Sequence, residues 1–182
     1  MKEIDREIKR RKVEREVFRY ILDSLRTLMV IAAASVLIST LLISVLRVNR
    51  SSMAPTFFDG EIIIALRHVA INRGDVIVFF YNNKLLVKRV IATVGDWVYI
   101  DENGVVYVND EALYEPYVRE KSFGVCDIEL PFQVPDKSFF VMGDQRATSL
   151  DSRLSSIGPV ERGLVEGRVV LRIWPLTRFK LF

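Results

Sequence analysis

The chain of 182 residues has room for one globular domain and one further segment, and half of its residues are hydrophobic. Its net charge of +3 lies entirely in residues 1–27, which hold nine Lys/Arg and six Asp/Glu, while the remainder holds 17 of each. A basic segment beside an apolar one is typical of a cytoplasmic membrane flank, so we interpret the charge as a topology signal and expect no nucleic-acid partner. The single cysteine, Cys126, excludes an internal disulfide and is expected to be a small buried side chain.

Residues 1–27 form the first predicted segment, which is cytoplasmic, amphipathic and basic. Its apolar residues recur every four or five positions with charges between them, which predicts a helix. That helix either lies on the inner membrane surface or runs directly into the segment that follows. A partner-binding role for its basic face is a minor alternative. The apolar positions are Ile4, Ile8, Val13, Val17, Ile21 and Leu25.

Residues 28–46 carry no charge and predict one transmembrane helix. Nineteen helical residues span roughly 28 Å, close to the thickness of the hydrocarbon core of a membrane. A cleaved signal peptide is the competing interpretation, but the apolar run is long and no small-x-small cleavage site follows it. By the positive-inside rule, residues 47–182 form an extracytoplasmic domain of a single-pass cell-membrane protein.

Residues 47–182 predict a mostly β domain of antiparallel strands with a loop-rich stretch over residues 109–137. Short β-branched and aromatic runs alternate with Gly, Asn and Asp turns, and Asn103-Gly104 is a strong hairpin signal. No helical periodicity longer than two turns follows residue 60. The expected strands cover residues 61–66, 76–81, 85–91, 97–100, 105–108, 138–142 and 167–173.

Two aromatic stretches leave alternatives open. Phe57-Phe58 are either core residues or side chains that dip into the membrane interface. The basic and aromatic tail formed by residues 178–182 either contacts the membrane surface or frays, as chain termini commonly do.

Ser52 lies on a Pro-bounded turn shortly after the apolar run and is the candidate nucleophile. A serine hydroxyl needs a base. The only histidine, His68, has no metal-ligand cluster around it and is a weak candidate. Lys88 is the best lysine because its neighbours along the chain are apolar, and burial can lower the pKa of a lysine from about 10.4 toward neutral pH. Most strand lysines nevertheless extend to water.

Four blocks of residues occur in a fixed order after the apolar run. They are Ser52–Thr56 (SMAPT), Gly74–Val78 (GDVIV), Lys88–Ile91 (KRVI) with Gly95-Asp96, and Gly143–Arg146 (GDQR) with Ser149, Asp151–Arg153 and Gly158. In composition and spacing this arrangement resembles the bacterial type I signal peptidase family. A single span and a short outer domain resemble its Gram-positive form.

The resemblance implies a signal-peptidase-like fold and a Ser-Lys mechanism, in which Ser52 is the nucleophile and Lys88 the general base. It implies that the Ser149 hydroxyl orients the lysine amine and that Asp151 and Arg153 form a supporting ion pair. Gly143 and Asp144 match the start of that loop, although Asp144 can also be an ordinary solvated loop residue. The resemblance implies no cofactor and no metal.

The oxyanion hole is the main departure from the family pattern. The family pairs the N–H of the nucleophile, here Ser52, with a donor two residues upstream, where this chain has Arg50. Either the backbone or the side chain of Arg50 donates, or Ser51 substitutes, or the hole is weaker. Smaller departures are Ala92 and Val94 for Gly and Pro, Gln145 for Asn, and two extra residues within 154–157.

The resulting functional hypothesis is a membrane-bound serine endopeptidase that removes signal peptides from secreted preproteins at Ala-x-Ala-type sites. Its partners would be signal-peptide-bearing preproteins and membrane lipid. The alternative is a catalytically weak or silent homologue that acts like a chaperone for pilins or one secretion cluster. A self-cleaving Ser-Lys repressor is a further rival, but it needs a DNA-binding helix-turn-helix, which the N-terminal segment does not offer.

Overall fold

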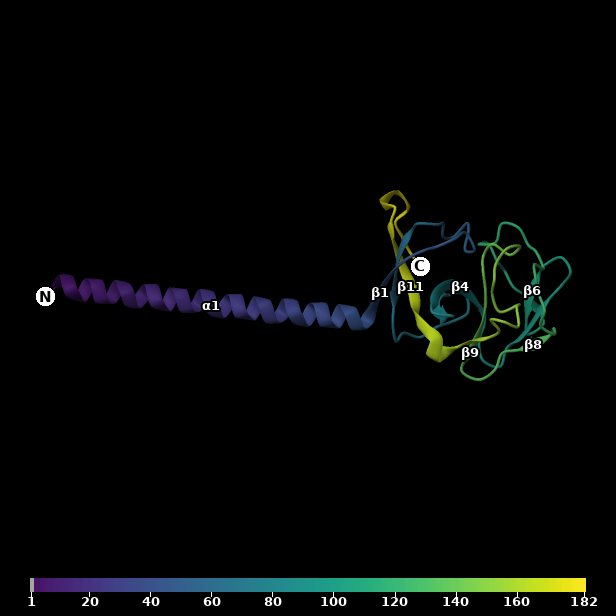
Figure 1. The fold of residues 1–182 in the computed structure, drawn as a ribbon, viewed down its shortest axis with the longest axis horizontal. Helices are drawn as coiled ribbons and strands as arrows, with labels where there is room; N and C mark the ends of the chain where they lie inside the picture. The colour runs from purple at the N-terminus through teal and green to yellow at the C-terminus, as the bar shows by residue number, and fades with distance from the viewer. Residues whose placement is uncertain (1) are drawn as a thin grey trace. The chain divides into compact units, whose positions relative to one another are not determined.

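The computed structural model describes residues 2–182, except for the side chains of residues 2–10, 13 and 14. The chain divides into two compact units, one ending at Leu42 and the other running from Ile43 to Phe182. The first is a single helix, and the second contains antiparallel strands joined by turns, loops and two short 3-10 helices (Figure 1). The predicted mostly β fold class, preceded by an apolar helix, is confirmed.

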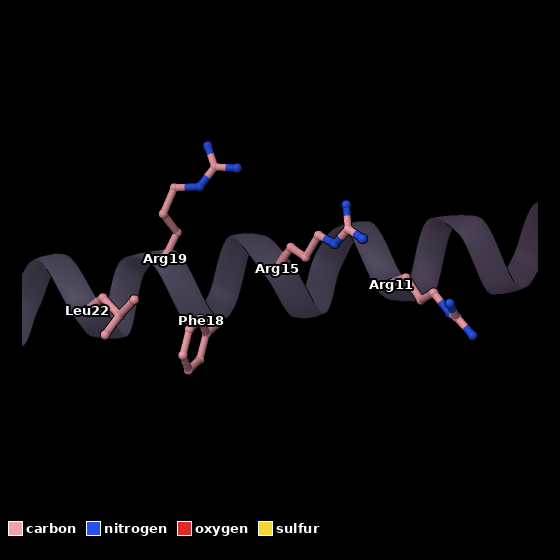
Figure 2. A pocket seen from close by; sticks show the side chains of 5 residues that line it. All are labelled: Arg11, Arg15, Phe18, Arg19 and Leu22. Carbon is pink, nitrogen blue, oxygen red and sulfur yellow. The ribbon is translucent and has the colours of Figure 1, made fainter.

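Helix α1 runs continuously over Lys2–Leu42. Its part from Arg15 to Leu42 is long and apolar enough to cross a membrane, and none of it is buried inside the protein. Before and at the start of that part, Arg11, Arg15 and Arg19 project from the helix, and Arg19 leaves on the side opposite to Phe18 (Figure 2). The basic flank and the apolar stretch therefore belong to one uninterrupted helix.

The predicted transmembrane helix over residues 28–46 is too long at its C-terminal end. The helix ends at Leu42, and the next residues form strand β1, Ile43–Arg47, which pairs with strand β2, Ile62–Leu66. An uncharged run is compatible with a membrane helix and with a buried strand alike. Here the pairing with β2 satisfies the backbone groups of the last four apolar residues and places them in the second unit.

The strands of the second unit form two sheets, and all of their pairs are antiparallel. An eight-stranded sheet has the order β1-β2-β11-β3-β4-β9-β10, with β12 added on β11, and a four-stranded sheet has the order β7-β6-β5-β8. The longest strand, β11, lies between β2 and β3 and appears in yellow in Figure 1. The remaining strands are β3 Val76–Tyr81, β4 Lys84–Ala92, β5 Trp97–Ile100, β6 Val106–Val108, β7 Glu111–Ala112, β8 Phe132–Gln133, β9 Ser138–Met142, β10 Val160–Glu161, β11 Val165–Trp174 and β12 Lys180–Leu181; the short 3-10 helices η1 and η2 cover Arg162–Leu164 and Leu176–Arg178.

The hairpin predicted from Asn103-Gly104 is present. Strands β5 and β6 pair with Ile100 opposite Val106, and the Gly104 N–H donates to the Asp101 carbonyl. Gly104 has a φ of +76°, a region that glycine enters without steric cost. A Cβ at this position would lie within 3 Å of the backbone of Ser122, so only glycine fits.

The two aromatic stretches resolve differently from one another. Phe57 is fully buried in the cluster of core residues that contains Met53 and Ile63, so its membrane-interface alternative is wrong, whereas the neighbouring Phe58 is 37% exposed. The tail does not fray, because β12 pairs with β11 and the ring of Phe182 packs 4.6 Å from that of Phe57. The C-terminal residue Phe182 therefore packs against the core cluster that contains Met53 and Phe57 of the Ser52 turn.

Candidate active site

Ser52 lies in the turn that follows β1, and two buried side chains hold this turn in place. Met53 and Phe57 are 1% and 0% exposed, and the Phe57 N–H donates to the Met53 carbonyl across 2.8 Å. Arg172 of β11 donates to the carbonyl of Thr56, also at 2.8 Å. Ser52 itself is half-buried, between the exposed Ser51 and the buried Met53 that anchors the turn in the core.

Lys88 reaches Ser52 from strand β4. Its Nζ lies 2.8 Å from the Ser52 Oγ, and Lys88 is only 2% exposed. The fold thereby brings two residues that are 36 positions apart in the chain to hydrogen-bond distance. General-base activation of a serine requires this geometry.

The surroundings of Lys88 favour the neutral amine. Its pKa is lowered to about 8, chiefly by burial; Asp151 and Asp144 oppose the change, and the nearby Arg153 contributes to it. Burial is the largest cause because a charged ammonium loses its water in a low-dielectric interior. A lysine with such a pKa is substantially neutral at mildly alkaline pH, so it can accept the hydroxyl proton of Ser52.

The loop from Gly143 to Arg153 packs directly against the Ser52 turn. The Gln145 N–H donates to the Ser52 carbonyl at 3.1 Å, and the Gly143 N–H donates to Asp151 Oδ2 at 3.0 Å. Asp151 and Arg153 form a completely buried ion pair with contacts of 2.8 and 2.9 Å. The loop that carries Ser149 is thus fixed from within.

Asp144 is not a solvated loop residue, contrary to the alternative that the sequence left open. It is 1% exposed, and Arg89 binds both of its oxygens at 2.9 and 2.6 Å. Thr56 Oγ1 donates to the same carboxylate at 2.5 Å. An ionised carboxylate is stable in the interior only with such partners, and Arg89 supplies the opposite charge from the position next to Lys88.

Ser149 is buried next to the dyad, but the structure does not contain the hydrogen bond to Lys88 that the resemblance implies. The Ser149 side chain packs against Gly143, and its Oγ has no hydrogen-bond partner among the described residues. Catalytic hydrogen bonds often form only when substrate is bound. The orienting role of Ser149 therefore stays a prediction.

The backbone of Arg50 cannot complete the oxyanion hole in this conformation. Its N–H donates to Asp59 Oδ1 at 2.7 Å, and its φ of +74° holds the turn in a left-handed conformation. In the described part of the chain the Ser52 N–H makes no hydrogen bond, so it is available to an oxyanion. The options that remain are a second donor from the exposed Arg50 side chain or from Ser51, or a weaker oxyanion hole.

Sequence reasoning missed several charged side chains that support the site. Arg89 and the buried pair formed by Arg146 and Glu115 were given no role, although the Arg146 and Glu115 side chains are completely buried. A charged residue in a loop-rich stretch is ordinarily solvated, so composition gave no signal of these pairs. Among the side chains that the structure describes, no group of three His, Cys, Asp or Glu is arranged to hold a metal ion.

Comparison with known proteins assigns the chain to a family. Residues 21–174 match the family model described as signal peptidase, peptidase S26, which covers most of the chain, so the chain belongs to this family. The fold and the serine-lysine contact agree with a signal peptidase of the serine-protease class. The apolar helix at the N-terminus agrees with membrane anchoring.

Two relatives from Streptococcus and Bacillus support the same assignment. The chain is 30% identical to signal peptidase I of Streptococcus pneumoniae serotype 4, with 75% of this chain and 84% of that protein covered. It is 37% identical to signal peptidase I U of Bacillus subtilis, with 65% and 69% covered. A solved structure of a signal peptidase I from Enterococcus faecalis is 27% identical, with 55% of this chain and 97% of that chain covered and a TM-score of 0.47.

Proposed function

We propose that this protein is a membrane-anchored endopeptidase that removes signal peptides from secreted preproteins, with Ser52 as nucleophile and Lys88 as general base. The observation that carries the proposal is the 2.8 Å contact between Lys88 Nζ and Ser52 Oγ in surroundings that lower the pKa of the lysine to about 8. The names of its relatives, signal peptidase I, support the choice of substrate class.

The reaction follows from this contact. Neutral Lys88 takes the hydroxyl proton as Ser52 Oγ attacks the carbonyl carbon of the scissile bond, and the Ser52 N–H donates to the developing oxyanion. The peptide C–N bond breaks as Lys88 returns the proton to the leaving amine, which leaves an acyl-enzyme on Ser52. Lys88 then takes a proton from a water molecule as the water oxygen attacks the ester carbon. The bond to Ser52 Oγ breaks as Lys88 returns this proton to Oγ, which releases the carboxylic acid product and restores Ser52 and neutral Lys88.

The edge of β4 next to Ser52 supports binding of an extended substrate. Strand β3 pairs with β4 over Lys84–Arg89, whereas β9 pairs with it only from Arg89 onward. Within residues 2–182, the stretch from Lys84 to Lys88 therefore has strand partners on one side only. A substrate segment can add there as a further strand, with backbone hydrogen bonds supplying the affinity.

The membrane topology belongs to the same proposal. The basic N-terminal flank of α1 favours a cytoplasmic N-terminus, which places the β unit outside the cell membrane. Enzyme and preprotein would then share one lipid surface, which raises the effective concentration of the cleavage site.

The decisive experiment compares cleavage of a membrane-inserted preprotein with an Ala-x-Ala site by the wild type, Ser52→Ala and Ser156→Ala in detergent micelles. We expect Ser52→Ala to lose all cleavage and Ser156→Ala, which alters an exposed serine, to retain it. Cleavage by Ser52→Ala would contradict the proposed nucleophile.

If the wild type itself does not cleave, a pilin precursor replaces the preprotein in the same assay. Silence with both substrates, together with no acylation of Ser52 by a β-lactam-type inhibitor, would favour a noncatalytic homologue that serves pilins or one secretion cluster.

A further inference from the structure

The turn Glu115–Val118 lies in the loop-rich stretch between β7 and β8, away from the sequence blocks that define the dyad. The Val118 N–H donates to the Glu115 carbonyl at 3.1 Å and closes the turn. Glu115 is buried and Tyr117 is half-buried, whereas the adjacent Tyr114 is 86% exposed. The turn therefore faces inward with two polar side chains that the mechanism above does not use.

Glu115 binds the loop that packs against Ser52. Both of its oxygens accept from Arg146, at 3.0 Å from Nη1 and 2.5 Å from Nη2. The Arg146 Nε donates at 3.0 Å to the carbonyl of Gly143, in the same loop. An isolated buried guanidinium would be strongly unfavourable, so Glu115 is what allows Arg146 to hold this loop from the interior.

Tyr117 contacts the other arginine of the site. The Arg89 guanidinium lies over its ring, 3.9 Å from the ring centroid, and the Tyr117 hydroxyl donates to Glu115 Oε1 at 3.1 Å. Burial and the nearby Glu115 carboxylate raise the pKa of Tyr117, so the phenol stays protonated and keeps donating. One side chain thus connects Arg89, which binds Asp144, with Glu115, which binds Arg146.

The chain immediately after the turn reaches the third buried arginine. Arg153 Nη1 donates to the carbonyl of Phe123 at 2.7 Å, and its Nη2 donates to the carbonyl of Arg146 at 2.8 Å. Gly124 lies so close that an added Cβ would come within 2.7 Å of the Arg146 carbonyl oxygen and of Arg153 Nη1. The segment from Glu115 to Gly124 therefore contacts Arg89, Arg146 and Arg153.

We propose that Glu115 and Tyr117 are positioning residues of the Ser52–Lys88 pair. Through Arg146 and Gly143 they hold the loop whose Gln145 N–H binds the Ser52 carbonyl, and through Arg89 they hold the middle of β4, where Lys88 is the preceding residue. Ser52 and Lys88 come from different segments of the chain. The turn contacts Arg146, which binds the loop beside Ser52, and Arg89, which follows Lys88 on β4. The proposal rests on the proposed peptidase function.

The test measures kcat and KM for cleavage of the membrane-inserted preprotein by Tyr117→Leu, Tyr117→Phe, Glu115→Gln and the control Tyr114→Leu. We expect Tyr117→Leu and Glu115→Gln to lower kcat by about tenfold or more with little change in KM, because small displacements of reacting groups reduce the rate without removing substrate contacts. Tyr117→Phe keeps the ring on Arg89 and should restore most of the rate, and Tyr114→Leu should behave as wild type.

Several outcomes overturn the proposal. A folded Tyr117→Leu with wild-type kcat does so, as does a folded Glu115→Gln with wild-type kcat, because neither the ring contact with Arg89 nor the charge of Glu115 on Arg146 then affects the reaction. If Tyr117→Leu does not fold, Glu115→Gln decides once thermal unfolding shows that it is folded, since its amide oxygen has the same reach and can still accept from Arg146.

If the wild type does not cleave, the proposed function fails separately. Amide hydrogen exchange at Gln145 then tests the positioning alone. Faster exchange in Tyr117→Leu than in Tyr114→Leu supports it, and equal exchange rates overturn it.

Discussion

At the scale of single residues, the charge state of Lys88 connects the fold to the chemistry. Its pKa falls from 10.5 to about 8, a net change that corresponds to roughly 3 kcal/mol of unfavourable free energy for the protonated form. Burial is the largest cause of this net change; Asp151 and Asp144 oppose it, and Arg153 acts in the same direction as burial. The core packing around β4 offsets this cost so that a proton acceptor stands beside Ser52.

The lowered pKa predicts how activity depends on pH. Only neutral Lys88 can accept the Ser52 proton, so kcat/KM should rise with pH along a limb whose midpoint is about 8. The measurement is cleavage of a fixed preprotein from pH 6 to about 10 at constant detergent and ionic strength. A limb centred near 10.5 would contradict a buried base.

The same lysine predicts a dependence of stability on pH. Its pKa is lower in the folded state, so between about 8 and 10.5 the unfolded chain binds more protons and the free energy of unfolding rises with pH. Lys88→Met should lack this rise, keep the fold, be more stable than wild type at pH 7 and have no activity. Urea titrations of both proteins at pH 7 and pH 10 measure the difference, and a wild-type rise that persists in Lys88→Met would point to another group.

From the sequence, Ser52 and Lys88 could be singled out as a candidate pair, which the structure brings into contact, but the charged side chains packed around them could not. A serine on a Pro-bounded turn and a lysine among apolar neighbours are local patterns that can be read along the chain. The pairing of Arg89 with Asp144 joins positions 55 apart, and that of Arg146 with Glu115 joins positions 31 apart. Such pairs depend on how strands and loops meet, which no local pattern encodes.

At the scale of elements, the loop from Gly143 to Arg153 packs so closely against the Ser52 turn that no side chain fits at position 143. A Cβ on Gly143 would lie 2.1 Å from Ser149 Oγ and 2.6 Å from the Ser52 carbonyl oxygen. Both distances are far inside van der Waals contact, and one neighbour is backbone. A side chain at position 143 must therefore displace the loop or the nucleophile.

Gly143→Ala consequently tests this fit. We expect it to lower stability by about 1–3 kcal/mol, as overpacking does, and to reduce cleavage strongly. Gly163→Ala is the matched control, because a Cβ there meets nothing within 4 Å and should leave stability and cleavage nearly unchanged. Thermal unfolding and kcat/KM of both variants are the measurements, and a fully active Gly143→Ala would show that the loop adjusts.

The sequence predicted the positions of the longer strands more accurately than it predicted where elements begin and end. The β-branched runs at 76–81 and 97–100 coincide with β3 and β5 because their side chains fit a half-buried pleated surface. The end of α1 was wrong because Ile43–Leu46 are apolar in either structure, and only pairing with β2 distinguishes them. The short strands β10 and β12 contain two residues each and were missed because two residues carry no period.

At the scale of the whole molecule, the apolar helix and the β unit have separate expected roles, membrane anchoring for the helix and catalysis for the β unit. The unit from Ile43 to Phe182 has its own hydrophobic core and contains every residue of the proposed site. The helix contributes none of them, so we expect it to act through location alone.

Residues 43–182 without α1 should therefore fold cooperatively and cleave a short soluble peptide at nearly the full-length rate. On a preprotein inserted in vesicles they should be slower by about tenfold or more, because proximity at the shared surface is lost. Parallel assays of the truncated and full-length proteins on both substrates measure this, and equal rates on the vesicle-bound preprotein would contradict the role given to the anchor.

The open edge of β4 also bears on how copies of this protein behave toward one another when crowded in a membrane. An unpaired strand edge is a template for any extended chain, including the same edge of a neighbouring copy. This edge is only five residues long, begins with the exposed Lys84 and ends with Lys88. Antiparallel pairing of two such edges would bring lysines together, so the chain that supplies the protease site also discourages its own self-association.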